Sequence, residues 1–241
     1  METSLAEHVS RPKEKNPILI VEGVSYTRIA VKTHLITFGE DLVSLLKRYV
    51  SPQLEPGDWI ALSEKVVSVS QSNMRHISTV KIGRLARLIV KGVKKYPNDR
   101  GWDSPEKMQL VVEMAGIPRT LLAMTLGALG KLFGIRGIFW IIVGERLGEI
   151  DGFNPVVMPP YNEYAMLPPL HPEATCAEIE KSVAPAIIID GNNINIKVIA
   201  MSPHMPVDRR LARLILLDNP MGQDRELTPF IIVRAGKRAS I

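Results

Sequence analysis

Two aspartates stand at the ends of apolar runs, where a carboxylate is well placed to do chemistry. Asp151 follows an apolar stretch and precedes a glycine, and Asp190 closes the run Ala186–Ile189 before a second glycine. A carboxylate at the end of a buried strand, on a glycine turn, can hold a hard cation that bridges phosphates. Asp-Gly is also ordinary turn chemistry, so the spacing alone leaves both interpretations open.

Other reactive side chains form no recognisable constellation. The five histidines are scattered without the spacing of metal ligands, and the single cysteine, Cys176, fits a small buried residue better than an activated thiol. The phosphate-binding pattern G-x-x-x-x-G-K-[ST], the pattern G-x-G-x-x-G after a strand, the nucleophile pattern G-x-S-x-G and the zinc pattern H-E-x-x-H are all absent. The sequence therefore gives no sign of a protein nucleophile.

Composition limits the class of protein. The chain has 241 residues, of which 46% are hydrophobic, so it can bury a sizeable core in one large or two small domains. Its net charge of +5 is unevenly spread, because residues 151–200 hold six acidic and two basic side chains whereas residues 51–100 hold four and nine. Aromatic residues make up only 5%, and together these features argue against a nucleic-acid binder. One cysteine excludes an intrachain disulfide framework.

The elements that must position the two aspartates predict an α+β fold, with mixed sheets flanked by helices. Strands are predicted where β-branched residues cluster, and helices where apolar residues recur at helical spacing. The predicted strands are 18–24, 28–37, 58–70, 138–143, 186–189, 194–200 and 230–233. The predicted helices are 39–50, 81–95, 104–115, 118–132, 175–182 and 207–217. Because strands and helices alternate irregularly, a regular doubly wound sheet is not expected.

Three further segments bear on location. Residues 1–16 are polar and predict a flexible leader without a signal peptide. The run Leu121–Val143 is mostly apolar, but Lys131 and Arg136 interrupt it, and its uncharged part is about half of the roughly 20 residues that a bilayer span needs. We therefore expect a buried helix, a glycine turn and a buried strand there. Residues 75–100 hold eight basic side chains against Asp99 alone, which suits a phosphate or anionic lipid surface, or simply a solvated helix face.

Several short stretches follow one another in the order in which a known family carries them. They are Val31–Leu42, Leu54–Ser68, Glu149–Asn154, Ala165–Pro169, Ile187–Asn192, and Met221–Gln223 with Pro229–Arg234. The stretch around Asp151 is similar to the family's GIDxSN, and the stretch around Asp190 is similar to its TDTNG. Together they resemble the coenzyme F-420 gamma-glutamyl ligases, which join L-glutamate to a deazaflavin precursor by an amide bond.

This resemblance implies a gamma-glutamyl ligase-like domain over residues 17–241, with two intertwined subdomains. It further implies GTP as co-substrate, magnesium or manganese as the divalent metal, a small-molecule acceptor, a homodimer and a cytoplasmic location. The implied site residues are the metal ligands Asp151 and Asp190, the nucleotide-binding Lys65 and Ser68, and Asn154 and Asn192, which would orient ligands or substrate.

The sequence also departs from the family pattern. Gln71 stands where the family has an acid close to the nucleotide, and the segment that follows Asn193 is short. Two alternatives therefore stay open beside the ligase. One is a ligand-binding member of the same fold without catalysis, and the other is a protein that associates with a membrane surface through residues 84–95 or 121–143.

Overall fold

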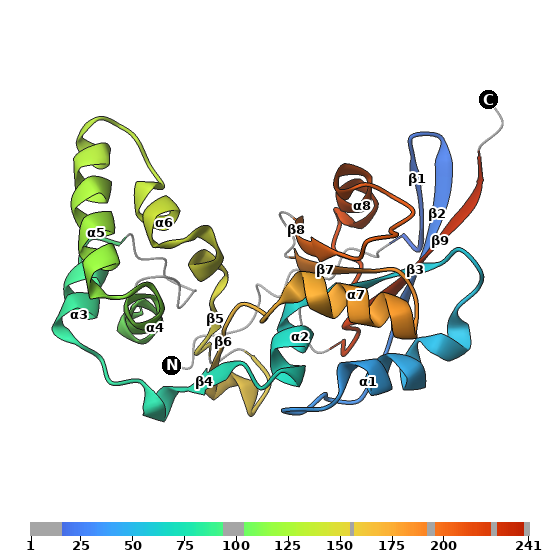
Figure 1. Ribbon diagram of the computed structural model, residues 1–241, viewed down its shortest axis with the longest axis horizontal. Coiled ribbons are helices and arrows are strands. Elements are labelled where there is room, and N and C mark those ends of the chain that lie inside the picture. The colour runs from blue at the N-terminus through green and yellow to red at the C-terminus, as the bar shows by residue number, and fades with distance from the viewer. Residues whose placement is uncertain (1–15, 94–103, 155–156, 192–195, 223–225, 239–241) are drawn as a thin grey trace, which may run out of the picture.

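The computed structural model describes residues 16–93, 104–154, 157–191, 196–222 and 226–238. Figure 1 shows a lobe built around a six-stranded sheet, a lobe built from helices, and a small three-stranded sheet between them. The prediction of a flexible leader falls on residues 1–16 and lies, apart from its last residue, outside the described residues. Helices and mixed sheets together confirm the predicted α+β class.

The six-stranded sheet places the last strand of the chain at its centre. In spatial order its strands are β1 (Ile18–Val21), β2 (Val24–Val31), β9 (Phe230–Arg238), β3 (Trp59–Ser63), β7 (Ala186–Gly191) and β8 (Ile196–Met201). Strands β3 and β7 run parallel, and every other neighbouring pair in this sheet is antiparallel. The predicted strand pair around Asp190 is therefore confirmed as β7 and β8.

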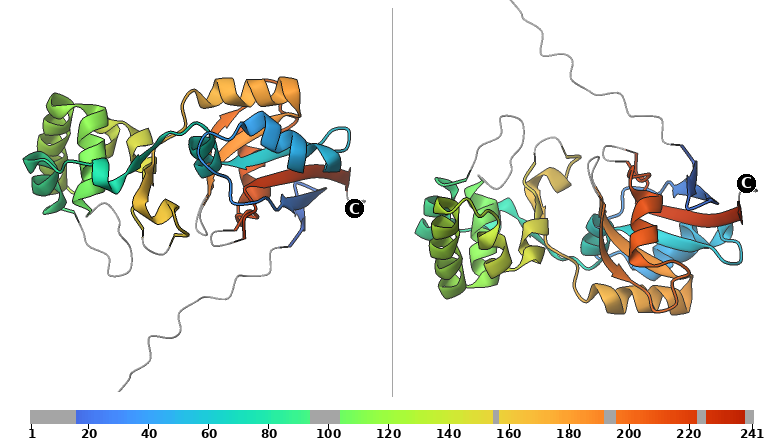
Figure 2. Two further views of the ribbon diagram at one scale, coloured as in Figure 1. Left: turned by 90° about the horizontal axis from the view of Figure 1, so that it is seen from below. Right: turned by 90° about the horizontal axis from the view of Figure 1, so that it is seen from above.

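Both faces of this sheet are buried, which explains why its central strands read as continuous apolar runs. Along β3, Ile60 and Leu62 belong to one core, whereas Trp59 and Ala61 belong to the other. The first core is covered by α1 (Leu42–Tyr49), α2 (Glu64–Ser70) and α7 (Pro172–Ser182), and the second by α8 (Arg209–Leu216). The two further views in Figure 2 show the sheet between these helices.

The helical lobe contains α3 (Arg84–Val90), α4 (Pro105–Ala115), α5 (Ile117–Leu132) and α6 (Ile138–Val143). These helices share a third core, which includes Val111 of α4 and Val143 of α6. Glycines let α5 approach α6 closely, because a Cβ on Gly130 would lie 2.3 Å from the Ile138 side chain. No single described helix is long and apolar enough to cross a membrane, although α4 and α5 pass that test as a pair bent by 115°.

The small sheet joins the two lobes. Its strands are β4 (Met74–His76), β6 (Tyr164–Met166) and β5 (Asp151–Gly152), with β6 in the middle and both neighbours antiparallel to it. Ala165 of β6 packs into the core of the helical lobe, whereas the next residue, Met166, packs against the sheet lobe. Short 3-10 helices complete the fold at Ser51–Gln53, Ile77–Thr79, Glu145–Glu149 and Tyr161–Glu163.

Capping side chains mark the starts of two helices. Asp41 accepts a hydrogen bond from the Ser44 N–H at the start of α1, and Ser104 accepts one from the Lys107 N–H at the start of α4. The helices predicted for residues 118–132, 175–182 and 207–217 are confirmed as α5, α7 and α8, with ends shifted by a few residues. The prediction that the helix in Leu121–Val143 is buried was wrong, because only one side of α5 packs into the core. The observed helix α3 covers only Arg84–Val90 and is therefore shorter than the predicted helix 81–95.

Several strand predictions were wrong in type or extent. Residues 64–70 form α2 instead of continuing β3, because packing of its valines against the sheet outweighs their weak preference for strands. Residues 138–143 form α6, and a short apolar run without alternation does not distinguish a buried strand from a buried helix. The strand predicted for 28–37 ends at Val31, where pairing with β9 stops.

Candidate functional site

The parallel pair of strands brings Lys65 and Asp190 to one edge of the sheet. Ser63, the last residue of β3, lies opposite Ile189 of β7, so the chain leaves both strands at the same level. Lys65 then lies in the first turn of α2, and Asp190 is the next residue of β7. The carboxyl ends of neighbouring parallel strands are where open sheets generally bind ligands. The charge of Asp190 contributes to raising the pKa of Lys65, after burial, which lowers it, and Asp151, which raises it.

Asp151 reaches the same place from the small sheet. Its Oδ2 lies 2.5 Å from the Lys65 Nζ, and its Oδ1 accepts a hydrogen bond of 2.8 Å from the Gly152 N–H. Gly152 has φ +132°, and a Cβ there would lie 2.1 Å from the carbonyl oxygen of Tyr164. The backbone at this turn therefore requires glycine, and glycine is what lets β5 approach β6 closely enough to present Asp151.

A third contributor, Lys107, comes from the helical lobe. Its Nζ lies 4.0 Å from the Asp151 Oδ1, and its side chain is buried in the first turn of α4. Sequence reasoning missed this residue, because a lysine in the first turn of a helix resembles any solvated surface lysine. Only its burial beside a carboxylate, which depends on how α4 packs against β5, distinguishes it.

The two carboxylates have opposite electrostatic settings. Burial raises the pKa of Asp151, but the charge and hydrogen bond of Lys65, helped by Lys107, outweigh burial and hold it below its ordinary value. Burial also raises the pKa of Asp190, and the negative charge of Asp151 raises it further, so its pKa lies above the ordinary value despite Lys65 and Lys197. Burial lowers the pKa of Lys65, yet Asp151 and Asp190 together leave it raised. Added positive charge between the two aspartates would therefore be favourable.

Ser68 has a structural partner in this conformation. Its buried hydroxyl donates a 2.7 Å hydrogen bond to the carbonyl of Leu167. Gln71 both donates to the Leu170 carbonyl, at 2.9 Å, and accepts from the Leu170 N–H, at 2.7 Å. The Asn73 side chain donates to the Pro168 carbonyl at 2.8 Å. These three side chains clamp the proline-rich segment against the end of α2.

This clamp explains the departure from the family pattern at Gln71. A glutamine can donate and accept at the same time, whereas an ionised acid only accepts, so an acid could not satisfy both backbone groups of Leu170. The prolines at 168 and 169 have no N–H, and the carbonyls around them need donors from elsewhere. That need is a signal that sequence reasoning could have used.

Of the two asparagines predicted to orient ligands, the structure describes one. Asn154 lies three residues beyond Asp151, is partly buried, and accepts at its backbone carbonyl a hydrogen bond from the Val157 N–H. Its predicted role in orienting a ligand stays a prediction. Asn192 directly follows β7 but lies outside the described residues.

The donor set fits a particular kind of metal site. Across the described ranges, no group of three or more histidine, cysteine, aspartate or glutamate side chains could hold a metal ion. Asp151 and Asp190 therefore offer at most a pair of carboxylates from the protein. A pair of carboxylates is what Mg²⁺ usually takes from a protein in a nucleotide site, where phosphate oxygens and water complete the coordination. The residues fit such a shared site and do not fit a closed structural metal cage.

Comparison with known proteins identifies the family of this chain. A family model described as F420-0:gamma-glutamyl ligase matches residues 30–199, well over half of the chain. The chain belongs to this family. Membership indicates a gamma-glutamyl ligase of coenzyme F420 biosynthesis, and Lys65, Asp151 and Asp190 all lie inside the matched range. The family match does not reach β1 or the central strand β9. No curated protein matches the chain significantly.

Proposed function

We propose that the chain is a nucleotide- and divalent-metal-dependent amide ligase that joins L-glutamate to the carboxylate of a small-molecule acceptor. The observation that supports the proposal is the meeting of Lys65, Asp151 and Asp190. They come from three separate elements, and two of them lie at the carboxyl edge of the parallel strands. Family membership supports the reaction class.

The reaction must first activate a poor electrophile. A carboxylate oxygen of the acceptor attacks the γ-phosphorus of GTP, the bond to the bridging oxygen breaks, and GDP leaves. The amine of L-glutamate then attacks the carbonyl carbon of the resulting acyl phosphate. A C–N bond forms, the C–O bond to phosphate breaks, and the amine loses a proton. Neither step needs a protein nucleophile, which agrees with the absence of a nucleophile motif from the sequence.

The described side chains are suited to the negative charge that the phosphates and the acceptor carboxylate bring together in these steps. Asp151 and Asp190 would hold the divalent ion, which supplies neutralising charge to the phosphate oxygens. Lys65 would place a point charge on the same phosphates. Its ion pair with Asp151 is about half exposed, with 51% and 43% of the two side chains accessible, and such pairs contribute at most about 1 kcal/mol. Lys65 can therefore exchange Asp151 for a phosphate at little cost.

Lys107 is suited to a fixed role in this scheme. It is buried in the first turn of α4 and approaches the Oδ1 of Asp151, whereas half-exposed Lys65 pairs with the Oδ2. Its positive charge lowers the pKa of Asp151. When Lys65 turns toward phosphate, Lys107 keeps Asp151 ionised and so keeps it a good metal ligand.

Nucleotide titration calorimetry in the presence and absence of Mg²⁺ tests the site. We expect wild-type protein to give a metal-dependent heat with GTP, and Asp151→Asn and Asp190→Asn to lose it while keeping the fold. Asp208→Asn is the matched control, because Asp208 caps α8 through the Leu211 N–H and asparagine caps a helix equally well. Nucleotide binding that is equal with and without Mg²⁺, or unchanged in both site variants, would contradict the proposed site.

A second measurement separates a ligase from a binding protein of the same fold. We expect phosphate release from GTP to require both L-glutamate and a deazaflavin acceptor that carries a free carboxylate. Metal-dependent GTP binding without phosphate release, under any combination of acceptor and amino acid, would support the catalytically silent alternative.

A further inference from the structure

The outer side of α5 carries apolar residues where a surface helix usually carries polar ones. Large apolar side chains are exposed along this helix and its C-terminal end, and we call six of them the apolar face: Leu121, Leu122, Leu126, Leu129, Leu132 and Phe133. Leu132 and Phe133 are the most exposed, with 82% and 74% of their surface accessible. They stand where the chain turns from α5 toward α6, at the far end of the helical lobe (Figure 1).

Solvent alone does not explain this face. Soluble monomers rarely expose contiguous apolar patches beyond a few hundred Å² without an interaction partner. The helix has 16 residues, or about 24 Å at the usual rise, which is too short to cross a bilayer of about 30 Å. Its other side is committed to the core, where Ala123 is fully buried and Thr120 bonds back to the Gly116 carbonyl. Such a helix is suited to lie on a surface instead of spanning it.

Positive charge surrounds the apolar face. Residues 117–143 contain Arg119, Lys131 and Arg136 and no acidic residue. Lys131 donates a 3.2 Å hydrogen bond to the Gly92 carbonyl, which places the end of α5 beside the end of α3.

Helix α3 adds more positive charge at the same end of the lobe. Arg84, Arg87 and Lys91 are exposed along it, and within the described ranges none of them forms a salt bridge. This end of the helical lobe thus combines exposed apolar side chains with exposed basic side chains around them.

The charges around the apolar face favour one kind of binding partner over another. If a second copy of this chain docked on the apolar face through the same segment, Lys131 and Arg136 would meet like charges without an acidic partner from 117–143. A bilayer with anionic headgroups offers the complementary arrangement, with acyl chains for the apolar face and phosphates for the basic side chains around it.

We propose that α5 and the turn after it dock on the surface of an anionic lipid bilayer. Leu132 and Phe133 enter the boundary between headgroups and acyl chains, and Lys131, Arg136 and the bases of α3 contact lipid phosphates. The apolar face lies at the end of the lobe away from β5 and the edge of the six-stranded sheet, so docking leaves the site around Asp151 open (Figures 1 and 2).

Co-sedimentation of the full chain with sucrose-loaded vesicles tests this proposal. Vesicles of phosphatidylcholine alone are compared with vesicles that also contain phosphatidylglycerol. We expect binding only with phosphatidylglycerol, and release when salt rises from about 0.1 M to about 0.5 M, because the attraction to headgroups is screened. The double variant Leu132→Gln with Phe133→Gln should lower the bound fraction about tenfold, since both side chains enter the acyl boundary.

A control with a comparable loss of exposed apolar surface is available in the other lobe. Ile18 and Ile20 on β1 are 49% and 63% exposed, and Ile18→Gln with Ile20→Gln should bind vesicles like wild type. All the substituted side chains are exposed, so both double variants should fold, as circular dichroism can verify.

Three results would overturn the proposal. The first is absence of binding to phosphatidylglycerol vesicles at low salt. The second is an equal loss of binding in both double variants. The third is a wild-type dimer, seen by light scattering, that the Leu132→Gln and Phe133→Gln variant dissociates, because the apolar face would then be covered by a second copy. Since GTP binding does not involve this face, it should be unchanged in the variant, so the test stands apart from that of the ligase site.

Discussion

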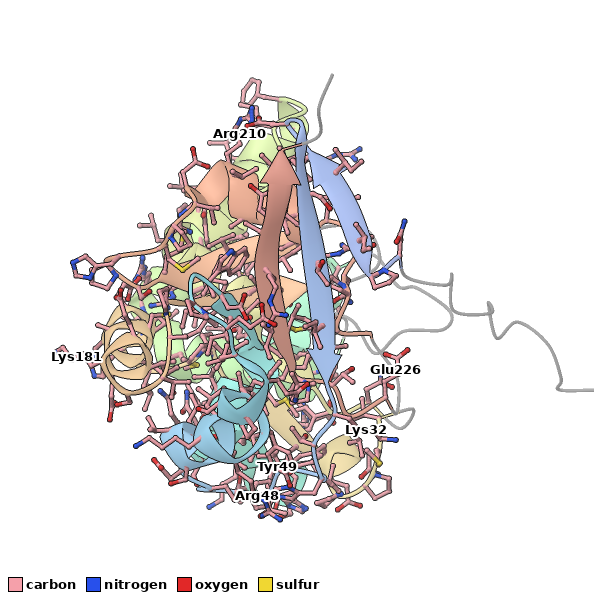
Figure 3. The ribbon with its side chains drawn as sticks, turned by 90° about the vertical axis from the view of Figure 1, so that its right-hand side faces the viewer. Lys32, Arg48, Tyr49, Lys181, Arg210 and Glu226 are labelled. Carbon is pink, nitrogen blue, oxygen red and sulfur yellow. The ribbon has the colours of Figure 1, made fainter. Side chains whose placement is uncertain are left out.

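The two lobes differ in how completely they bury their apolar side chains. The sheet lobe covers both faces of its sheet with helices, and its outer end carries exposed charged side chains, including Lys32, Arg48, Lys181 and Arg210 (Figure 3). The helical lobe buries one side of α5 and leaves the other side apolar and exposed. The sheet lobe therefore buries most of its apolar surface, apart from side chains such as Ile18 and Ile20 on β1, whereas the helical lobe exposes one whole side of a helix, which is suited to a partner.

The two lobes and the small sheet also provide different residues of the candidate site. The sheet lobe provides Lys65 on α2 and Asp190 on β7, the small sheet provides Asp151, and the helical lobe adds Lys107. A site assembled in this way depends on how the lobes are held together, so substitutions in the two lobes and at their junction should have distinct consequences.

The largest effect is expected from truncating the centre of the sheet lobe. Phe230 is fully buried on β9 between β2 and β3, and Phe230→Ala should lower the free energy of unfolding by about 3–5 kcal/mol. Leu129→Ala on exposed α5 is the contrast, with a change of at most about 0.5 kcal/mol. Denaturant unfolding measures both. Equal losses in the two variants would mean that the lobes do not differ as described.

A smaller effect is expected at the junction. Gly152→Ala forces a Cβ into the Tyr164 carbonyl and should cost about 2 kcal/mol or more, together with metal-dependent GTP binding, because Asp151 shifts. Gly23→Ala is the matched control. Gly23 also has a positive φ, of +76°, but open space around it, so only the backbone penalty of about 1–2 kcal/mol remains and GTP binding should persist. If both variants kept GTP binding, the position of Asp151 would not depend on this close approach.

A substitution in the clamp on the proline-rich segment should lower the stability by less. Gln71→Glu keeps the shape of the side chain but removes the donor to the Leu170 carbonyl, and should cost about 1 kcal/mol. Thermal unfolding at neutral pH and again near pH 4 measures it, because protonation of the introduced acid restores a donor. A cost that is the same at both pH values would contradict the hydrogen bond as its cause.

The smallest effect has opposite signs at the two aspartates. In metal-free protein at neutral pH, Asp151→Asn should lower the melting temperature, because Lys65 and buried Lys107 lose their counter-charge. Asp190→Asn should raise it, because the pKa of Asp190 is raised and its charged form is unfavourable in the fold. Each change should amount to less than about 1 kcal/mol, since the pair is partly exposed.

The pH dependence follows from the directions of the two pKa shifts. The contribution of Asp151 is present above the ordinary pKa of 3.8 and is lost as pH falls through its lower folded pKa. The cost at Asp190 is present above its raised pKa and disappears as pH falls toward 3.8, so the benefit of Asp190→Asn should vanish there. Differential scanning calorimetry over this range tests both signs. Two variants with shifts of the same sign would contradict the electrostatic contrast.

Much of the local structure could be read from residue types. The helix predicted from Ser104 onward is α4, which Ser104 caps, and the apolar run before the Asp190–Gly191 turn identified β7 and its neighbour β8. The strand assigned to residues 138–143 failed because periodicity in a run of six apolar residues is ambiguous. The strand assigned to 64–70 failed because burial of Val66 and Val67 against the sheet decided their conformation.

The sequence by itself determined which side chains could serve as ligands, and that Asp190 closes an apolar strand before a glycine. The expectation that Asp151 ends a strand was wrong, because Asp151 follows the 3-10 helix Glu145–Glu149 and opens β5. Only the tertiary structure decided that Asp151 and Asp190 both act on Lys65, because 38 residues separate the two aspartates. The parallel pairing of β3 with β7 brings Lys65 and Asp190 to one edge, and the small sheet brings Asp151 to Lys65. It also decided that Lys107 is buried beside Asp151 and that the outer side of α5 is uncovered. Burial is a property of how elements pack, and a residue's type sets only the cost of that burial.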